Sequence, residues 1–455
     1  MSKSDKTVYE CSACGGQSPK WLGRCPDCGA WSTLHETRGR APAKRGGATG
    51  AARTPLALDA VLAAAEQAPR MPTGMAEIDR VLGGGVVPGA VMLIGGDPGI
   101  GKSTLLMQVC LAAAAGGLSA LYVTAEESAA QVALRAQRLG SGQGVLLLAT
   151  TDLADVEAAL SAGRHALVVV DSIQTLRAAE LQSAPGSVAQ LREVAARLTD
   201  LARQSAAAMF LIGHVTKDGT LAGPKVLEHL VDVVLAFEGD SAHAYRLLRG
   251  QKNRFGPSHE IGVFEMVAEG LREVPDPSAL FIAERPLRAA GSVVVPTAEG
   301  SRPLLVEVQA LVAPAQYGAP RRVVTGLDGT RLALLLAVLQ RKAGIQVLDL
   351  DVFASVAGGA RVEEPAVDLG LCAAVVSALR ERPLLDGLIA FGEVGLTGEL
   401  RAVPRAAARV AEARKLGFGR IVLPRGSAER LTAAESAGVE LVPVTRLDDA
   451  LAALF

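Results

Sequence analysis

The stretch GDPGIGKS, residues 96–103, decides the fold of this chain. It fits the pattern GxxxxGK followed by Ser or Thr, and it stands between the apolar run VMLIG and a run of helical character. Glycine-rich backbone lets successive N–H groups face phosphates, and the N-terminus of the following helix adds a favourable dipole. This context predicts a nucleotide site between a strand and a helix. Its expected members are Gly96, Asp97, Pro98, Gly99, Ile100, Gly101, Lys102, Ser103 and Thr104.

Carboxylates further along the chain are expected to complete this site. Within the stretch itself, Lys102 is expected to contact the outer phosphates and Ser103 to ligate Mg²⁺. The apolar run ALVVVD ends at Asp171, which is the expected partner of that Mg²⁺. Glu126 and Glu127 follow the run ALYVTA, where a carboxylate can polarise the attacking water. Two solvated acids at a helix start are the plain alternative.

The sequence around the site predicts a parallel α/β sheet. Strand-like runs (VMLIGG, ALYVTA, ALVVVD and AMFLIGH) alternate with Ala- and Leu-rich helical segments from about residue 70 to 275. The apolar stretch 105–125 is long enough to suggest a membrane span, but Gln108 and the Gly116-Gly117 pair interrupt it. It therefore predicts a helix, a turn and a buried strand.

Changes of composition divide the 455 residues into several parts, more than one ordinary domain would need. A unit rich in Cys, Gly and Trp spans 8–31, and a basic linker rich in Gly, Ala and Pro follows over 32–68. The nucleotide-binding domain is expected over 69–275. The segment EVPDPS marks its end, and a second α/β domain is expected over 279–455, with strands in SVVVPT, LLVEVQALV and RIVLP.

Four cysteines predict a zinc site in the first unit. Cys11 and Cys14 form one CxxC pair, and Cys25 and Cys28 form a second, so together they offer four thiolates for tetrahedral zinc. A unit this small cannot build a useful core, so the metal would supply its folding energy. Redox dithiols are the alternative. Two tryptophans, Trp21 and Trp31, are expected to cover the site.

Composition excludes some classes of protein. Lysine and arginine total 46 against 47 acids, which gives a net charge of -1 and argues against a histone-like coating of nucleic acid. Aromatic residues make up 3%, which argues against recognition built mainly on base stacking. The polar start MSKSDKTVYECSACGG is unlike a secretory signal. We therefore expect a cytoplasmic protein without a membrane partner.

The order of these motifs resembles the bacterial RadA family, also called Sms, of DNA repair proteins. The likeness rests on the cysteine unit, GGDPGIGKS, VVVDS and above all KNRFG at 252–256, and it covers nearly the whole chain. The segments HVTKDGTLAGPKVLEHLVD and GEVGLTGELR agree with it. The resemblance implies a hexameric ring of RecA-like fold that hydrolyses ATP, binds single-stranded and branched DNA, and drives branch migration beside a RecA-type recombinase.

Several residue roles follow from this resemblance. Glu126 would be the general base and His214 a phosphate sensor, although His214 is also readily explained as a structural residue. Lys252 and Arg254 would reach the nucleotide of the neighbouring subunit, or link it to DNA, where a fixed cation stabilises charge at the γ-phosphate. A solvated turn is the alternative for these two cations.

The resemblance also suggests where DNA would bind. The segments 176–192 and 215–226 correspond in order to the DNA-binding loops of RecA-type rings, and the second contains Lys217 and Lys225. Both lysines could equally be ordinary surface residues. Arg321 and Arg322, after a Gly-Ala-Pro turn, are a further candidate basic surface, with a simple exposed pair as the alternative.

The last domain resembles the peptidase domain of Lon, most clearly at GEVGLTGELRAV. Such peptidases need a Ser nucleophile and a Lys that accepts its proton. Here the matching positions hold Val367 and Ala407, and the stretch EPAVDL contains neither residue type. We expect this domain to be catalytically inactive and to hold the ring together.

Three functions are therefore weighed: an ATP-driven DNA translocase, an ATP-dependent peptidase and an ATP-gated scaffold of RecA-like fold without motor activity. The missing Ser and Lys argue against the second. Whether DNA stimulates hydrolysis separates the first from the third.

Overall fold

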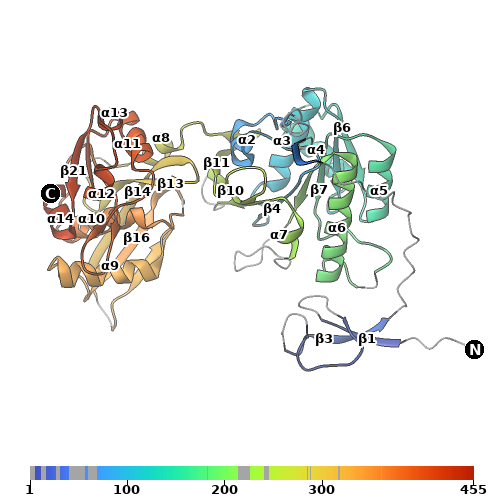
Figure 1. Cartoon of the computed structure of the whole chain (residues 1–455), viewed down its shortest axis with the longest axis horizontal. Helices are drawn as coiled ribbons and strands as arrows, with labels where there is room; N and C mark the ends of the chain where they lie inside the picture. Colours follow the sequence, from blue (N-terminus) through green and yellow to red (C-terminus); the bar gives the residue numbers. More distant parts are fainter. Residues whose placement is uncertain are drawn as a thin grey trace, which may run out of the picture. The chain divides into compact units, whose positions relative to one another are not determined.

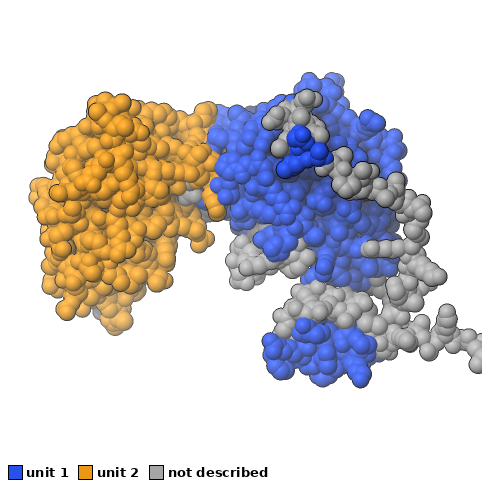
Figure 2. Space-filling model, viewed as in Figure 1, with its two compact units in different colours: residues 1–238, 247–258, 266–273 blue, residues 239–246, 259–265, 274–455 orange. Residues whose placement is uncertain are grey.

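The structure is a computed structural model, and it describes residues 6–11, 17–26, 31–39, 57–59, 69–140, 142–181, 183–213, 226–239, 245–283, 285–286, 288–315, 318–359 and 361–455. The chain divides into two compact units, which are coloured separately in Figure 2. The first comprises 1–238, 247–258 and 266–273, and the second comprises 239–246, 259–265 and 274–455. In the described part of the chain, no helix has the length and apolar character needed to cross a bilayer.

A sheet of order β12-β11-β10-β9-β4-β8-β7-β5-β6 organises the nucleotide-binding part (Figure 1). The strands from β9 to β6 run parallel, whereas β10 pairs with β9 in the antiparallel sense. The four predicted strands are confirmed as β4, β5, β7 and β8, and each is buried along its whole length. The bounds are β4 Val91–Gly96, β5 Ala120–Thr124, β6 Val145–Ala149, β7 Leu167–Asp171, β8 Ala208–Ile212, β9 Val233–Glu238, β10 Tyr245–Asn253, β11 Ile261–Val267 and β12 Gly270–Glu273.

Helices cover this sheet because their apolar faces need burial. α5 and α6 contribute leucines and valines to one core together with β4, β5, β7 and β8. The stretch 105–125 forms most of α3, a turn and β5, so the prediction of a helix, a turn and a strand is confirmed. α4 begins at a capping box in which Ser128 and Gln131 bond each other's backbone. The helices are α2 Ala76–Leu82, α3 Lys102–Ala115, α4 Ala129–Leu139, α5 Leu153–Ala162, α6 Val188–Ser205 and α7 Val226–Leu230.

The cysteine-rich segment forms a small antiparallel sheet of order β2-β1-β3. β1 (Lys6–Cys11) pairs with β3 (Leu34–Gly39) along its length, and β2 (Gln17–Ser18) flanks β1. The sheet thus continues past residue 31 into the stretch that the composition suggested was linker. Cross-strand pairing rather than composition decides this end of the unit.

The second unit is also α/β. One sheet has the order β13-β14-β16-β15, another has β17-β20-β21, and β18 and β19 form a hairpin. The strands predicted in SVVVPT, LLVEVQALV and RIVLP are confirmed as β13, β14 and β20. The strands are β13 Ser292–Glu299, β14 Arg302–Pro314, β15 Arg322–Thr325, β16 Leu350–Val356, β17 Leu388–Ala390, β18 Glu393–Val394, β19 Leu400–Arg401, β20 Arg420–Pro424 and β21 Glu440–Val444. The helices are α8 Pro277–Ile282, α9 Gly329–Lys342, α10 Asp368–Leu379, α11 Ala406–Lys415, α12 Arg425–Ala428, α13 Ala433–Ser436 and α14 Leu447–Leu454.

Candidate functional site

The loop between β4 and α3 has a backbone that glycine alone adopts easily. Gly99 and Gly101 have φ of 79° and 114°, in the left-handed region that strains other residues. At Gly96 an added Cβ would lie 2.4 Å from the carbonyl oxygen of Phe237, so this position also excludes a side chain. The loop therefore has the conformation expected of a phosphate cradle, with its N–H groups at the start of α3.

Lys102 is folded back onto this loop. Its Nζ donates to the carbonyl oxygens of Gly96 at 2.7 Å and Asp97 at 2.9 Å, and the residue is buried. Burial lowers the pKa of the Lys102 ammonium, while the carboxylates of Asp171, Asp97 and Glu126 oppose that shift. The predicted phosphate contact therefore lies in the field of the predicted metal ligand and the predicted base.

Asp171 ends β7 and is buried at the carboxyl end of the parallel strands. The Tyr122 hydroxyl, from β5, donates to Asp171 Oδ2 at 2.6 Å. A carboxylate at Asp171 and a hydroxyl at Ser103, the second residue of α3, are the hard oxygen donors that Mg²⁺ prefers. The donor chemistry of the site thus fits a magnesium ion beside the phosphate cradle.

The adjacent glutamates after β5 differ in their partners. Glu127 receives the guanidinium of Arg135 on both carboxylate oxygens, and its backbone N–H donates to Thr124 Oγ1 at 3.2 Å. Glu126 is exposed and accepts from the Ser172 hydroxyl. Arg135 therefore neutralises Glu127, whereas Glu126 lies near Lys102 and beside the end of β7. This arrangement favours Glu126 over Glu127 as the predicted base.

Two of the four predicted zinc ligands lie in the described part of the small unit. Cys11 and Cys25, one from each CxxC pair, share a buried cluster with Leu34. Bringing together thiols from both pairs is what a single tetrahedral zinc site requires, so these residues fit the metal. Cys14 and Cys28 lie outside the described residues.

The tryptophans differ from the expectation that they cover this site. Trp21 and Trp31 are 58% and 72% exposed, because the cluster is closed by Leu34 instead. The Arg24 guanidinium stacks on the Trp31 ring, 5.9 Å from its centroid.

Comparison with known proteins agrees with this geometry. A family model described as an AAA domain matches residues 52–220, and one described as a rubredoxin metal binding domain matches residues 9–36. A DNA repair protein RadA from Pseudomonas aeruginosa is 52% identical over 100% of both chains. The chain belongs to the RadA family of DNA repair proteins. Relatives of the same name from Bacillus subtilis and Escherichia coli are 45% and 46% identical, each over 99% of both chains.

The two family models identify two parts of the chain. The AAA match covers the phosphate cradle and Asp171, so the first unit contains an ATPase domain. The second match covers both CxxC pairs, so the small sheet is the zinc ribbon of this chain. The predicted family and the α/β fold class are confirmed.

Lys252 and Arg254 lie at the end of the sheet opposite the cradle. Lys252 Nζ donates to the carbonyl oxygens of Glu228 at 2.5 Å and Val231 at 2.8 Å, at the end of α7. Arg254 Nη1 lies 3.2 Å from Asp232 Oδ1. Burial and the neighbouring Arg254 lower the pKa of the Lys252 ammonium.

Asp232 shows at which end of the sheet these cations lie. It immediately precedes β9, and its backbone N–H donates to the carbonyl of Val91 at the start of β4. The cradle lies at the other end of β4, about 16 Å away at roughly 3.3 Å per residue. The two cations are therefore placed away from the phosphates that Lys102 would hold.

The remaining predicted residues divide into two groups. Arg321 is paired with Asp351 through Nη2 at 2.7 Å, and Arg322 Nη2 donates to the Leu348 carbonyl at 2.7 Å. Both guanidinium groups thus have partners within the second unit. His214, Lys217 and Lys225 lie outside the described residues.

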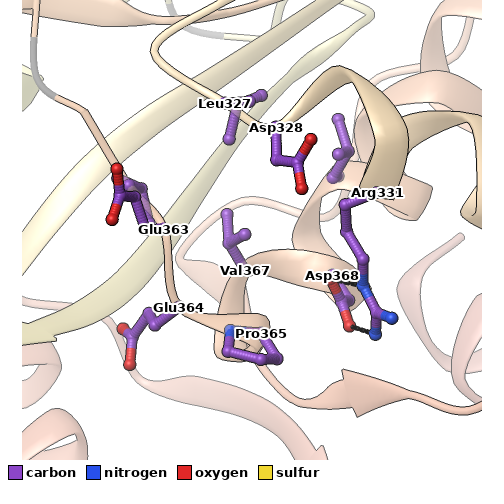
Figure 3. A pocket seen from close by; sticks show the side chains of 10 residues that line it. Leu327, Asp328, Arg331, Glu363, Glu364, Pro365, Val367 and Asp368 are labelled. Atoms are coloured by element: carbon purple, nitrogen blue, oxygen red, sulfur yellow. Dashed lines mark hydrogen bonds and ion pairs between the residues drawn. The ribbon is translucent and has the colours of Figure 1, made fainter. Parts of the chain in front are cut away.

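The position expected for a peptidase nucleophile borders a hollow of about 220 Å³ in the second unit (Figure 3). Val367 lines it, and Arg331 reaches across to Asp368. Glu364 also lines the hollow and binds Arg409, which follows Ala407 by two residues on α11. Among its lining residues there is no serine or lysine.

Sequence reasoning missed three residues of the nucleotide end. Tyr122, Arg135 and Ser172 contact Asp171, Glu127 and Glu126, respectively. Tyr122 and Arg135 belong to no short motif, whereas Ser172 is the last residue of VVVDS. One hint was available, because Tyr122 carries a hydroxyl in the middle of the buried strand ALYVT. A buried hydroxyl needs a partner, and here the partner is the predicted metal ligand.

Proposed function

We propose that this chain is a DNA-dependent ATPase and translocase that promotes branch migration in homologous recombination and repair as a hexameric ring in the cytoplasm. The observation that supports this most is the position of Lys252 and Arg254, at the end of the sheet opposite the cradle. Cations in that position cannot serve their own nucleotide, but they suit a neighbour's in a head-to-tail ring. Hydrolysis in one subunit would then depend on its contact with the next.

Within one subunit, each residue has a simple role. Lys102 would leave the loop carbonyls to hold the outer phosphates, and Ser103 and Asp171 would hold a Mg²⁺ ion, which would offset phosphate charge. Glu126, steadied by the Ser172 hydroxyl, orients the attacking water. His214 follows β8 in the sequence and is proposed to sense the γ-phosphate.

The DNA partner would meet the segments that follow β7 and β8. Lys217 and Lys225 precede α7, whose last carbonyls hold Lys252. The segment proposed to bind DNA is therefore continuous in the chain with the helix that holds a proposed trans-acting cation. Arg321 and Arg322 are weaker DNA candidates, because Arg321 already pairs with Asp351 and the Arg322 guanidinium already donates to backbone carbonyls in the second unit.

The test uses the full chain with ATP, forked DNA and a joint molecule made by a RecA-type recombinase. Lys252→Ala should bind ATP with unchanged affinity, yet lose DNA-stimulated hydrolysis and strand displacement. Lys415→Ala, which removes an exposed pair with Asp276, is the matched control and should behave as the parent. Unchanged branch migration by Lys252→Ala would contradict the trans role. A parent that neither responds to DNA nor displaces strands would instead be an ATP-gated scaffold.

The second unit is proposed to assemble the ring without proteolysis. The pair of Glu364 and Arg409 stands beside the positions where a Ser and Lys would be needed. Incubation of the full chain with casein and ATP should therefore release no peptides. ATP-dependent degradation would overturn this part of the proposal.

Zinc is proposed to be bound by Cys11, Cys14, Cys25 and Cys28 and to fold the small unit. Removal of the metal with a chelator should unfold the ribbon and leave the thermal transition of the ATPase core in place. Trp21 and Trp31 fluorescence reports the ribbon alone, because these are the two tryptophans of the chain. An unchanged tryptophan spectrum after complete loss of zinc would contradict the assignment.

A further inference from the structure

We propose that Tyr122 and Arg135 are positioning residues of the nucleotide site. Tyr122 fixes the Asp171 carboxylate through its hydroxyl, and Arg135 holds Glu127 away from the water so that Glu126 acts alone. This proposal rests on the proposed hydrolysis of Mg²⁺-ATP at the P-loop. It does not depend on DNA or on ring motion.

The Tyr122 hydroxyl is fully buried in the sheet beside the metal ligand. Tyr122 stands on β5 two residues before Thr124, whose register partner on β7 is Asp171. The ring is 0% exposed, and its hydroxyl lies 2.6 Å from Asp171 Oδ2. One oxygen of Asp171 is thereby held in place, and the other is left for the metal.

Arg135 reaches the same carboxylate from α4. Its Nη2 donates to both oxygens of Glu127, and its Nη1 lies 4.0 Å from Asp171 Oδ2. That Nη1 is buried and has no hydrogen-bond acceptor among the residues that the structure describes. A buried donor without an acceptor costs free energy, and here it leaves positive charge beside the metal ligand.

These contacts explain why two adjacent acids do not compete. Nη2 of Arg135 bonds both oxygens of Glu127 and offsets its charge, which weakens Glu127 as a base even though its side chain is 37% exposed. Glu126, which shares the segment but not this partner, lies beside Ser172 at the end of β7. Arg135 therefore selects one of the two acids, while Tyr122 and Arg135 together set the position and the charge of Asp171.

The main test is Tyr122→Phe in the full chain, with Mg²⁺-dependent ATP binding measured by calorimetry and ATP hydrolysis measured without DNA over the same range of Mg²⁺ concentrations. Loss of one hydrogen bond to a charged group should raise the half-saturating Mg²⁺ concentration about tenfold. The rate at saturating Mg²⁺ should stay within about twofold, because the reacting groups are intact. Tyr245→Phe, in the second unit, is the matched control. An unchanged Mg²⁺ requirement in a folded Tyr122→Phe protein would overturn the proposal.

A second set of variants decides the question if Tyr122→Phe does not fold. Glu126→Gln should lower the rate at least ten times more than Glu127→Gln, because Arg135 already neutralises Glu127. Arg135→Gln should lower the rate about tenfold, and adding Glu127→Gln should restore most of that loss. Equal effects of the two glutamate variants, or no restoration, would overturn the proposal. Lys102→Ala distinguishes a failure of this positioning proposal from a failure of the proposed function. ATP hydrolysis that remains in Lys102→Ala does not come from the P-loop.

Discussion

The nucleotide end of the first unit and the hollow of the second unit both bury charged side chains, but they satisfy them differently. Lys102 donates to two backbone carbonyls, and three carboxylates lie near it without an ion pair to it. Arg409, which is 0% exposed, has both oxygens of Glu364 and the carbonyl of Pro296 at 2.5 to 2.7 Å. A bound ligand can replace the two carbonyls around Lys102 at little cost in free energy. Arg409, by contrast, already has its partners within the protein, and it links α11 to Glu364 and to β13.

Arg409→Ala should have the largest effect if this contrast is right. The substitution leaves the Glu364 carboxylate, whose side chain is 20% exposed, without its fully buried cation, and breaking such a largely buried pair costs about 3–5 kcal/mol. Chemical denaturation of the full chain should show the transition of the second unit moving to lower denaturant. ATP binding should be retained. A companion variant, Arg409→Met with Glu364→Gln, should recover most of the stability, and equal damage by both variants would count against the ion pair as the cause.

Lys102→Ala should have the second-largest effect, and it should lower ATP turnover without lowering stability. Loss of one fixed cation at the phosphates should reduce ATP turnover by about 100- to 1000-fold. The denaturation midpoint should hardly change, because Lys102 contacts backbone carbonyls that water can reach once the side chain is gone. Turnover near that of the parent would refute the nucleotide site, and a large loss of stability would erase the contrast with Arg409.

Ser172→Ala should have an intermediate effect. Its hydroxyl donates to Glu126, and a hydrogen bond to a charged group contributes about 1.5 kcal/mol, or roughly tenfold in rate. The fall should appear in kcat at saturating ATP and Mg²⁺, with the ATP affinity unchanged. Ser205→Ala, on the exposed end of α6, is the control. A rise in KM without a fall in kcat would place Ser172 in binding rather than in orienting Glu126.

Arg288→Ala should have the smallest effect. Arg288 pairs with Asp386 at 2.8 Å, but the two side chains are 75% and 60% exposed, so solvent screens the pair. The unfolding midpoint should move by about 1 °C or less in a thermal scan. A shift as large as that of Arg409→Ala would mean that burial does not separate the two kinds of ion pair.

The sequence predicts those parts of the molecule that local pattern determines. Continuous apolar runs identify β4, β5, β7 and β8, because a parallel strand must bury both faces. The cradle is equally predictable, since positive φ at Gly99 and Gly101 and the close approach at Gly96 demand glycine.

Local sequence patterns do not predict contacts between residues that are far apart in the sequence. Tyr122 meets Asp171 across 49 positions of the sequence because β5 pairs with β7, and Arg409 meets Glu364 across 45 positions. Neither pairing leaves a local spacing to detect. β3 was likewise hidden, since its polar sequence LHETRG becomes a strand through pairing with β1.

The attachment of Lys252 to α7 has a consequence for communication around an assembly. A lysine that moves to serve an adjacent nucleotide must abandon the carbonyls of Glu228 and Val231. Those two carbonyls would then be exposed to solvent, and α7 would lose the hydrogen bonds that attach it to Lys252. In the proposed ring, amide exchange over 226–231 would thus accelerate when the adjoining subunit binds nucleotide, so this exchange would report occupancy in that neighbour.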